Sequence, residues 1–398
     1  MRTRQRVLDK LMRLLVCNFE YPPLGGGGGV VTAALVRALA RRHEVTVLTS
    51  RAFDLPPVSF DGRIRVVRVP TLFRKELSVA SFASMFTYLA SACMRAPGLC
   101  RRAGFDAVNT HFVVPTGPVG QWIADCSRIP NVLSLHGGDL YDPSKRLSPH
   151  RHRWLRGPVK SMLRRADTVV ANSTSTAAHV RNTYGVDRDV NVVPLGIERP
   201  PVVAGASRSY FGIPEDVFVA VTIGRLIPRK QTGQLVRAVA RSGIANAHLL
   251  VIGDGPEAKE IGRIAGELGI AERVKLLGFV SEEDKFRALA VADVFASTSE
   301  HEGFGLVFVE ALASGLPIVC YDAGGQTDFL ASGENGYVIE LGDETAFTAA
   351  LRSLAGSVDQ RRAIGVANRC KAKSYFIERC AEQYEAILER AVARRSGR

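Results

Sequence analysis

Two carboxylates, Glu302 and Glu310, lie on either side of a glycine-flanked phenylalanine and an apolar run. The apolar residues after Gly305 recur at helical spacing and Gly315 is a typical helix stop, so the sequence predicts a helix that begins near Gly305. The amides of residues 303–305 then lie at the positive end of the helix dipole, where an anion is favoured. Both carboxylates can reach an anion bound by these amides. This arrangement suggests a phosphate-linked sugar whose hydroxyl groups donate hydrogen bonds to the carboxylates. The alternative is a surface loop before a core helix, with both glutamates solvated.

A basic loop follows a predicted strand further upstream, at residues 223–230. A strand-end glycine frees the backbone there, and Arg225 and Lys230 place two positive charges on one loop, which suits a diphosphate leaving group. A solvated basic loop is the alternative. Two further turns, at residues 253–256 and 277–281, also follow strands and are expected at the same edge of the sheet.

The elements that must position these residues alternate between strand-like runs and helix-period segments, which predicts an α/β fold with parallel, doubly wound sheets. Near the start, a strand, five glycines and a helix from about Val31 to Arg42 form a βαβ unit. A second series begins after the Pro- and Gly-bearing stretch 194–214, so two Rossmann-like domains are expected. The predicted strands are residues 13–19, 44–49, 64–69, 107–109, 132–136, 168–171 and 190–193, then 217–223, 248–252, 274–276, 294–296 and 317–321.

Two helical segments need separate weighing. The final helix, residues 372–394, has no strand after it and is expected to cross back to the first domain, although packing on the second also fits its pattern. The stretch Leu77 to Met94 has no charged residue and basic residues on both sides. Its serines dilute the hydrophobicity, which favours a buried or partly buried helix over an interfacial helix or a membrane span.

Composition limits the class of protein. The chain has 398 residues, 46% of them hydrophobic and 23% charged, as in a globular protein of two domains. Its seven cysteines show no paired spacing, which indicates a reducing, cytoplasmic setting and no zinc site. The net charge of +13 is uneven, because residues 1–195 carry 28 Lys and Arg against 13 Asp and Glu, whereas the remainder carries 24 against 26. An anionic partner of the first half, or simply a soluble basic surface, would explain this asymmetry.

Taken in order, these motifs resemble the family 4 retaining glycosyltransferases, which have the GT-B fold of two Rossmann-like domains facing across a cleft. The resemblance covers nearly the whole chain. It rests on Tyr21-Pro22-Pro23 with the glycine run, His136-Gly137-Gly138-Asp139, Ala171-Asn172-Ser173, Pro194 to Glu198, Gly224-Arg225 with Lys230, Gly253 to Pro256, Gly278-Phe279-Val280, Glu302 with Glu310, and Gly324-Gly325. It implies an acceptor-binding domain at 1–195, a nucleotide-sugar-binding domain at 196–374 and a C-terminal helix at 375–398.

The resemblance also implies a role for each matching residue of the donor-binding domain. Arg225 and Lys230 would hold the donor diphosphate. Glu310 would bind the ribose hydroxyls and Glu302 the transferred sugar, and Val280 would lie against the nucleobase. Backbone amides would come from the three residues Phe304, Gly305 and Leu306.

From the first domain, the resemblance implies that Gly26 or Gly27 lets the loop approach the donor phosphate. His136 would contact the sugar near the reacting carbon. Without the resemblance, the preferred interpretation of His136 is a histidine at the end of a strand whose ring makes local hydrogen bonds. Together with Glu302, His136 is therefore expected to be catalytic. Neither a metal nor another cofactor is expected, because the cationic clamp replaces a metal.

A retaining hexosyltransferase is thus expected, with either front-face displacement, in which the leaving phosphate accepts the proton, or a double displacement. A GT-B epimerase or phosphorylase shares the fold, but no pyridoxal-binding lysine is identified. A dinucleotide-dependent oxidoreductase would need an acidic residue after the second strand, where Thr49, Ser50 and Arg51 stand. A nucleic-acid binder would leave the glutamates without a purpose.

A basic cluster between residues 145 and 165 follows the histidine motif and is expected to lie in the acceptor domain. An anionic lipid headgroup or a phosphorylated acceptor is the preferred partner, ahead of a solvated face and then of nucleic acid. A peripheral position at the inner face of the plasma membrane would follow, with a lipid-linked, polysaccharide or other glycan acceptor. The residues proposed for this face are Arg151, Arg153, Trp154 and Arg156.

Overall fold

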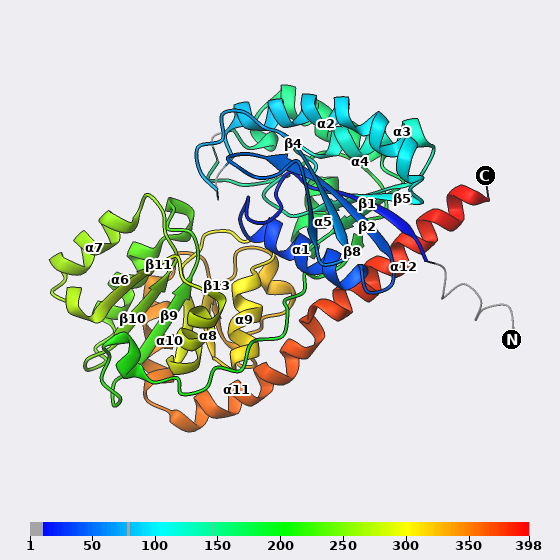
Figure 1. Ribbon diagram of the computed structural model, residues 1–398. Coiled ribbons are helices and arrows are strands. Elements are labelled where there is room, and N and C mark those ends of the chain that lie inside the picture. The colour runs from blue at the N-terminus through cyan, green and yellow to red at the C-terminus, as the bar shows by residue number, and fades with distance from the viewer. Residues whose placement is uncertain (1–10, 78–79, 146, 398) are drawn as a thin grey trace, which may run out of the picture. The chain divides into compact units, whose positions relative to one another are not determined.

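The computed structural model describes residues 11–77, 80–145 and 147–397. The chain divides into two compact units (Figure 1): unit 1 comprises Met1–Gly196 and Ile377–Arg398, and unit 2 comprises Ile197–Phe376. Each unit is a mainly parallel sheet with helices packed on it, so the expected α/β fold with two Rossmann-like domains is confirmed.

The sheet of unit 1 has the strand order β3-β4-β2-β1-β5-β6-β7-β8. Every pairing is parallel except that of β3 with β4. The run from β4 to β7 has the Rossmann order, which changes direction between β1 and β5. The strands are β1 Arg13–Cys17, β2 Glu44–Arg51, β3 Val58–Asp61, β4 Ile64–Pro70, β5 Ala107–His111, β6 Asn131–Leu135, β7 Thr168–Ala171 and β8 Asn191–Val192.

The helices of unit 1 cover both faces of this sheet because its strands alternate their side chains. On β1, Leu14 and Val16 join the core under α1 and α12, whereas Leu15 and Cys17 join the core under α2 and α3. Figure 1 shows α1 and α12 on one face and α2, α3 and α4 on the other. The helices are α1 Gly27–Leu39, α2 Phe82–Ala103, α3 Gly117–Ser127, α4 Arg153–Arg165, α5 Thr174–Asn182 and α12 Ile377–Ser396.

The sheet of unit 2 has the order β11-β10-β9-β12-β13-β14, all parallel, and changes direction between β9 and β12. Its strands are β9 Val219–Ile223, β10 His248–Ile252, β11 Val274–Gly278, β12 Val294–Ser297, β13 Ile318–Tyr321 and β14 Gly336–Ile339. Its helices are α6 Thr232–Arg241, α7 Ala258–Glu267, α8 Glu282–Val291, α9 Leu306–Ser314, α10 Glu344–Ala355 and α11 Val358–Ala372. Helices α6, α7 and α10 pack on one face, and the ring of Phe308 in α9 contacts Phe295 on the other.

The final helix packs on unit 1, but the prediction that it starts at residue 372 is wrong. Helix α11 ends there, a 3-10 turn spans Lys373–Tyr375, and Phe376 is extended, so α12 begins only at Ile377. Its buried face, which includes Tyr384, lies in the core under α1. At Gly196 a Cβ atom would lie 2.6 Å from the Cα of Ile377, so only glycine allows this return of the chain.

Three other predictions need correction or completion. Helix α1 begins at Gly27, four residues before the predicted Val31, so its first turn is glycine. Strands β3 and β14 were not predicted. The first, Val58–Asp61, is half-exposed and pairs with only one strand, and the second, Gly336–Ile339, is a short edge strand that starts with glycine.

The apolar stretch from Leu77 to Met94 lies partly in α2, which begins at Phe82 after the N-cap Ser81. Residues 78 and 79 lie outside the described residues. One face of α2, including Tyr88, is buried, and Met94 on another face is exposed, as in a partly buried helix. None of the helices in the described part of the chain combines the length and the apolar character that crossing a bilayer requires.

Candidate functional site

The candidate site of unit 2 lies where its sheet changes direction. Strands β9 and β12 are hydrogen-bonded neighbours, and both end at the same edge because they are parallel. The loop after β9 contains Arg225 and Lys230, and the loop after β12 leads to Glu302. In open α/β sheets this crevice at the carboxyl ends of the strands is where ligands bind.

Glu302 is held by two cations. The Lys230 ammonium forms an ion pair with Glu302 Oε1, and an Arg229 Nη lies 3.6 Å from Oε2 and donates to the carbonyl of His301. Side-chain exposure is only 15% for Lys230, 16% for Arg229 and 9% for Glu302. Burial alone would raise the pKa of Glu302, but the charges of Lys230 and Arg229 overcome this effect and lower it. The sequence reasoning did not assign a role to Arg229, although it directly precedes Lys230.

Arg225 lies on the same loop but is exposed. The loop itself is fixed by close backbone packing: a Cβ atom on Gly253, whose φ is +128°, would lie 2.0 Å from the carbonyl oxygen of Gly224. The Lys230 side chain crosses over Gly224, whose own Cβ would lie 3.2 Å from Cε. The structure therefore brings Lys230 to Glu302 and leaves Arg225 free to meet a ligand from the solvent side.

The segment Phe304-Gly305-Leu306 forms the start of α9, as predicted. Gly305 is the N-cap with φ of +90°, no side chain caps this helix, and Leu306 is its first residue. Phe304 is buried against Phe329, with ring centroids 5.1 Å apart, so only its backbone is available to a ligand. The first-turn amides thus form an anion-binding helix N-terminus beside the Lys230–Glu302 pair.

The loop that follows β13 packs against the main chain of Glu302. The amide of Gly325 donates to the carbonyl of Glu302 at 2.8 Å. At Gly324, with φ of +125°, a Cβ atom would lie 2.2 Å from that same oxygen. The two glycines therefore hold the main chain of Glu302 in place.

Glu310 has a partner that sequence reasoning missed. Lys285 of α8 places its Nζ 2.7 Å from Glu310 Oε1, and the two side chains are 12% and 14% exposed. Burial raises the pKa of Glu310, and the charge of Lys285 opposes that rise without cancelling it. Lys285 lies among acidic residues that pattern alone reads as a solvated helix face, so the sequence held no signal for it.

Val280 follows β11 at the same edge of the sheet and is half-buried. Its neighbour Phe279 is 95% exposed. An exposed aromatic ring and a half-buried aliphatic side chain here present an apolar surface of the kind that a nucleobase covers.

The candidate site of unit 1 also lies where a sheet changes direction, between β1 and β5. The glycine run follows β1, and the Glu20 carboxylate accepts the amide of Gly26 at 3.1 Å. Gly26 has open space around its Cα, and Gly27 is the first residue of α1. A Cβ atom on Gly28 would lie 2.3 Å from the Phe112 ring, so this ring rests directly on the glycine run.

His136 follows β6 and stacks on Phe112, with ring centroids 4.2 Å apart. Asp139 fixes the loop, because its two carboxylate oxygens accept the amides of His136 at 3.0 Å and of Val113 at 2.8 Å. Burial lowers the pKa of His136 to about 4, so the imidazole is neutral near neutral pH. Nε2 of His136 lies 3.0 Å from Nδ1 of His111. Sequence reasoning missed this contact, although His111 comes two residues after the predicted strand 107–109.

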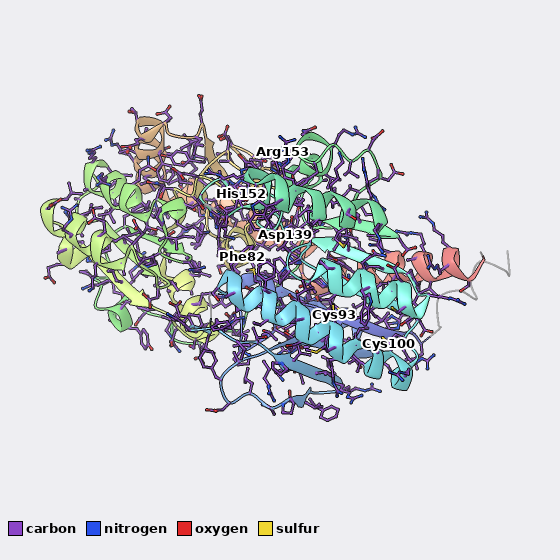
Figure 2. The ribbon with its side chains drawn as sticks, turned by 90° about the horizontal axis from the view of Figure 1, so that it is seen from above. Phe82, Cys93, Cys100, Asp139, His152 and Arg153 are labelled. Carbon is purple, nitrogen blue, oxygen red and sulfur yellow. The ribbon has the colours of Figure 1, made fainter. Side chains whose placement is uncertain are left out.

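The proposed acceptor face lies at the first turn of α4. Arg153 and Arg156 are exposed there, Trp154 is 55% exposed, and Arg151 is exposed in the 3-10 turn Pro149–Arg151 just before the helix. The Trp154 ring contacts Phe82 at the start of α2, with centroids 5.9 Å apart, and Figure 2 shows Phe82 on the same side of unit 1 as Arg153. Arg146 of the basic cluster lies outside the described residues.

An exposed apolar patch adjoins this face. Phe86 contacts Phe82, with ring centroids 5.1 Å apart, and is 56% exposed. The segment with Leu72 and Phe73, which are 58% and 65% exposed, is tied to α2 by hydrogen bonds to Thr87 and Ser81. We call Leu72, Phe73, Phe82, Phe86 and Trp154 the aromatic patch.

Comparisons with known proteins agree with this geometry. The family model Glycosyltransferase Family 4 matches residues 25–199, and the model Glycosyl transferases group 1 matches residues 205–369. This chain belongs to the group 1, family 4 glycosyltransferases. It is therefore an enzyme that uses nucleotide-sugar donors, and the expected hexosyltransferase class follows from the family.

Two curated relatives are each 29% identical to this glycosyltransferase. The GDP-mannose-dependent alpha-(1-6)-phosphatidylinositol monomannoside mannosyltransferase of Mycolicibacterium smegmatis aligns with 89% of this chain and 92% of its own length. The N-acetyl-alpha-D-glucosaminyl L-malate synthase of Bacillus anthracis aligns with 94% of this chain and 97% of its own length. Their acceptors differ in chemistry, so the family alone does not name the acceptor.

Solved structures show the same fold. Sucrose-phosphate synthase from Thermosynechococcus elongatus has a TM-score of 0.82 at 22% identity and covers 96% of this chain and 99% of its own. Anabaena HepE in complex with UDP-glucose has a TM-score of 0.74 at 21% identity and covers 95% and 99%.

Proposed function

We propose that this glycosyltransferase transfers a hexose with retention of anomeric configuration, with unit 2 binding the nucleoside-diphosphate donor and unit 1 the acceptor. The observation that carries the proposal is the Lys230–Glu302 ion pair beside Arg229 and the uncapped start of α9. A diphosphate carries two desolvated anionic groups, which need cations and oriented amides together. The Nε of Arg229 is buried without a hydrogen-bond partner among the described residues and adds an unused donor.

In the proposed complex, the diphosphate binds the ammonium group of Lys230, which then no longer pairs with Glu302. The diphosphate also binds Arg225. Glu302, still beside Arg229, then accepts hydroxyls of the transferred sugar. Glu310 accepts the ribose hydroxyls, and Val280 lies against the base. The backbone amides at the start of α9 bind the phosphates.

The proposed chemical step is a front-face displacement. The bond between the anomeric carbon and the diphosphate oxygen breaks, and its electron pair leaves with the diphosphate. The acceptor oxygen bonds to the anomeric carbon on the same face, and its proton passes to the departing phosphate oxygen. We favour this step over double displacement because Glu302, in the proposed complex, stays beside Arg229 and accepts hydrogen bonds from the sugar hydroxyls, so the carboxylate is not free to attack the anomeric carbon. No metal or other cofactor takes part in the proposed reaction, since the basic side chains supply the positive charge.

The donor proposal is tested by thermal shift and calorimetry with UDP, GDP, ADP, CDP, NAD and a short DNA duplex. A ligand that binds the native state raises its stability, by about 2.7 kcal/mol at a concentration 100 times Kd. We expect stabilisation by at least one nucleoside diphosphate. Stabilisation by NAD or DNA alone would overturn the proposal and favour an oxidoreductase or a nucleic-acid binder.

Three variants assign the roles. Lys230→Met and Glu310→Gln should weaken binding of that nucleotide, whereas His136→Ala should retain binding and abolish transfer. The matched control is Lys259→Met, at an exposed position of α7 in the same unit. If Lys230→Met binds the nucleotide as tightly as Lys259→Met does, the clamp has been assigned to the wrong residue.

For the acceptor, we propose a lipid-linked glycan at an anionic membrane surface, with the protein peripheral on the cytoplasmic side. Support comes from the aromatic patch beside Arg151, Arg153 and Arg156, because aromatic side chains with neighbouring basic residues suit the interface of an acidic bilayer. Both features lie in the basic half of the chain.

Vesicle sedimentation tests this surface. The wild type should bind vesicles that contain phosphatidylglycerol and not those of phosphatidylcholine alone. Replacement of Phe73, Phe86 and Trp154 by serine should abolish binding. Phe60→Ser is the control, because Phe60 of β3 is 71% exposed but is not part of the patch. Equal loss in the control and the patch variant, or equal binding to both vesicles, would refute the surface.

A further inference from the structure

A chain of buried polar side chains leads to His136. Asn109 and His111 lie two residues apart on β5 and therefore on the same face of the sheet, and both are buried. The ring of His111 bridges the other two side chains: its Nε2 lies 2.8 Å from Asn109 Oδ1, and its Nδ1 lies 3.0 Å from His136 Nε2. Each link needs one donor and one acceptor, so the direction of the protons along the chain can be worked out from its far end.

The far end is fixed by the main chain of β6. The side-chain nitrogen of Asn109, Nδ2, lies 3.0 Å from the carbonyl oxygen of Val132 and 3.0 Å from Ser134 Oγ. A backbone carbonyl only accepts hydrogen bonds, so this end of the side chain must be the NH₂ group. Oδ1 of Asn109 then faces His111 and can only accept, which places a proton on Nε2 of His111.

The same reasoning extends to His136. Burial and the neighbouring His136 ring lower the pKa of His111 far below its usual range, so this ring is neutral and holds one proton. With that proton on Nε2, its Nδ1 is a lone pair, and the hydrogen bond to His136 requires a proton on Nε2 of His136. His136 is neutral as well, so its Nδ1 is also a lone pair.

We propose that His111 is a positioning residue that fixes the tautomer of His136, so that the free Nδ1 of His136 accepts a hydrogen bond from a hydroxyl group of the bound sugar or acceptor. This inference rests on the proposed function of His136. Among the described residues, no hydrogen-bond partner meets that Nδ1, and the His136 side chain is half-buried, so the lone pair is available to a ligand. Phe112 stacks on the ring and Asp139 holds its backbone, but neither sets the tautomer.

The consequence is a fixed direction for the substrate hydroxyl. A neutral histidine without a partner on Nε2 exchanges between two tautomers, and in one of them Nδ1 carries a proton and repels a donating hydroxyl. Such a site would lose one oriented hydrogen bond, for which we expect a drop in kcat/KM of about fivefold, since a hydrogen bond contributes on the order of 1 kcal/mol.

The experiment compares the wild type with His111→Phe and His111→Gln. Phenylalanine keeps an aromatic ring beside Tyr384, with which His111 stacks at a ring-centroid distance of 6.2 Å, but it cannot accept a hydrogen bond from Nε2–H of His136. Glutamine restores an acceptor for Nε2–H of His136. Long-range ¹H–¹⁵N spectra of histidine-labelled protein report the tautomer directly, and the spectrum of His136 is assigned by its loss in His136→Ala.

The expected result has three parts. His136 of the wild type and of His111→Gln carries its proton on Nε2, whereas His111→Phe shows a mixture of tautomers. Transfer activity falls about fivefold in His111→Phe and recovers to within about twofold of the wild type in His111→Gln. The nucleotide affinity of unit 2 stays unchanged in both variants.

Two results would overturn the inference: a proton on Nδ1 of His136 in the wild type, or equal activity losses in the Phe and Gln variants. Both leave the proposed function standing as long as a nucleoside diphosphate binds. If no nucleoside diphosphate binds, the proposed function fails, and the spectra still decide which nitrogen of His136 carries the proton. If His111→Phe does not fold, comparison of His111→Gln with Asn109→Leu, which frees the His111 proton, tests the same tautomer.

Discussion

Loss of Lys285 should destabilise unit 2 in a strongly pH-dependent way. Lys285→Leu leaves Glu310 buried without its partner, because the side chains of Lys285 and Glu310 are only 12% and 14% exposed. Removing one partner of a buried ion pair costs about 3–5 kcal/mol, so we expect a loss of about 2–4 kcal/mol at pH 8 for this slightly exposed pair. The pKa of Glu310 is already raised by burial and will rise further in the variant.

The sign of the pH effect follows from that raised pKa. A carboxyl group with a higher pKa in the folded than in the unfolded protein costs stability above its folded pKa, and this cost disappears as the pH falls through that value. The difference between Lys285→Leu and the wild type should therefore be smaller at pH 5 than at pH 8. Adding Glu310→Gln should restore most of the stability at pH 8, because no buried charge remains.

Urea unfolding followed by two signals measures this effect in the intact chain. Both tryptophans, Trp122 and Trp154, belong to unit 1, whereas circular dichroism reports both units. The variant should shift the dichroism transition and leave the tryptophan fluorescence transition in place. The exposed Lys259→Leu is the control. An equal loss at both pH values, or no recovery with Glu310→Gln, would show that the pair is not the source of the stability.

Further predictions concern the clamp loop and its charge. Transfer activity should survive EDTA, because Lys230 and its neighbouring arginines neutralise the diphosphate; a loss that Mg²⁺ restores would contradict this. Gly253→Ala should weaken nucleotide binding at least tenfold in calorimetry, since its Cβ would lie 2.0 Å from the Gly224 carbonyl and φ is +128°. Its control is Gly262→Ala in α7, where a Cβ meets nothing within 4 Å, and which should raise the free energy of unfolding by about 0.5–1 kcal/mol. Equal nucleotide affinity in the two alanine variants would refute the role of the close packing at Gly253.

Much of the fold could be predicted because strands buried on both faces leave an apolar run in the sequence. Strands β7 and β10 match their predicted ranges, and the start of α9 follows Gly305 as predicted. The prediction failed where that signal is weak, at the edge strands β3 and β14 and in the glycine turn that opens α1.

The candidate site was predicted only in part. Residues with a local motif could be named, among them Lys230, Glu302 and His136. The partners that tune them could not, because Lys285 and His111 reach Glu310 and His136 from elements 25 positions away along the chain. A charged residue on an amphipathic helix looks the same in the sequence whether it faces solvent or a buried carboxylate.

The sequence by itself determined the alternation of strands and helices and the glycines that let loops approach one another, since both follow from local periodicity and backbone geometry. Only the tertiary structure decided which charges are neutralised and which nitrogen of His136 keeps a lone pair. These properties depend on burial and on hydrogen bonds between strands that the crossover connections bring together. The local sequence does not indicate which strands become neighbours, and the chemistry of this glycosyltransferase depends on those neighbours.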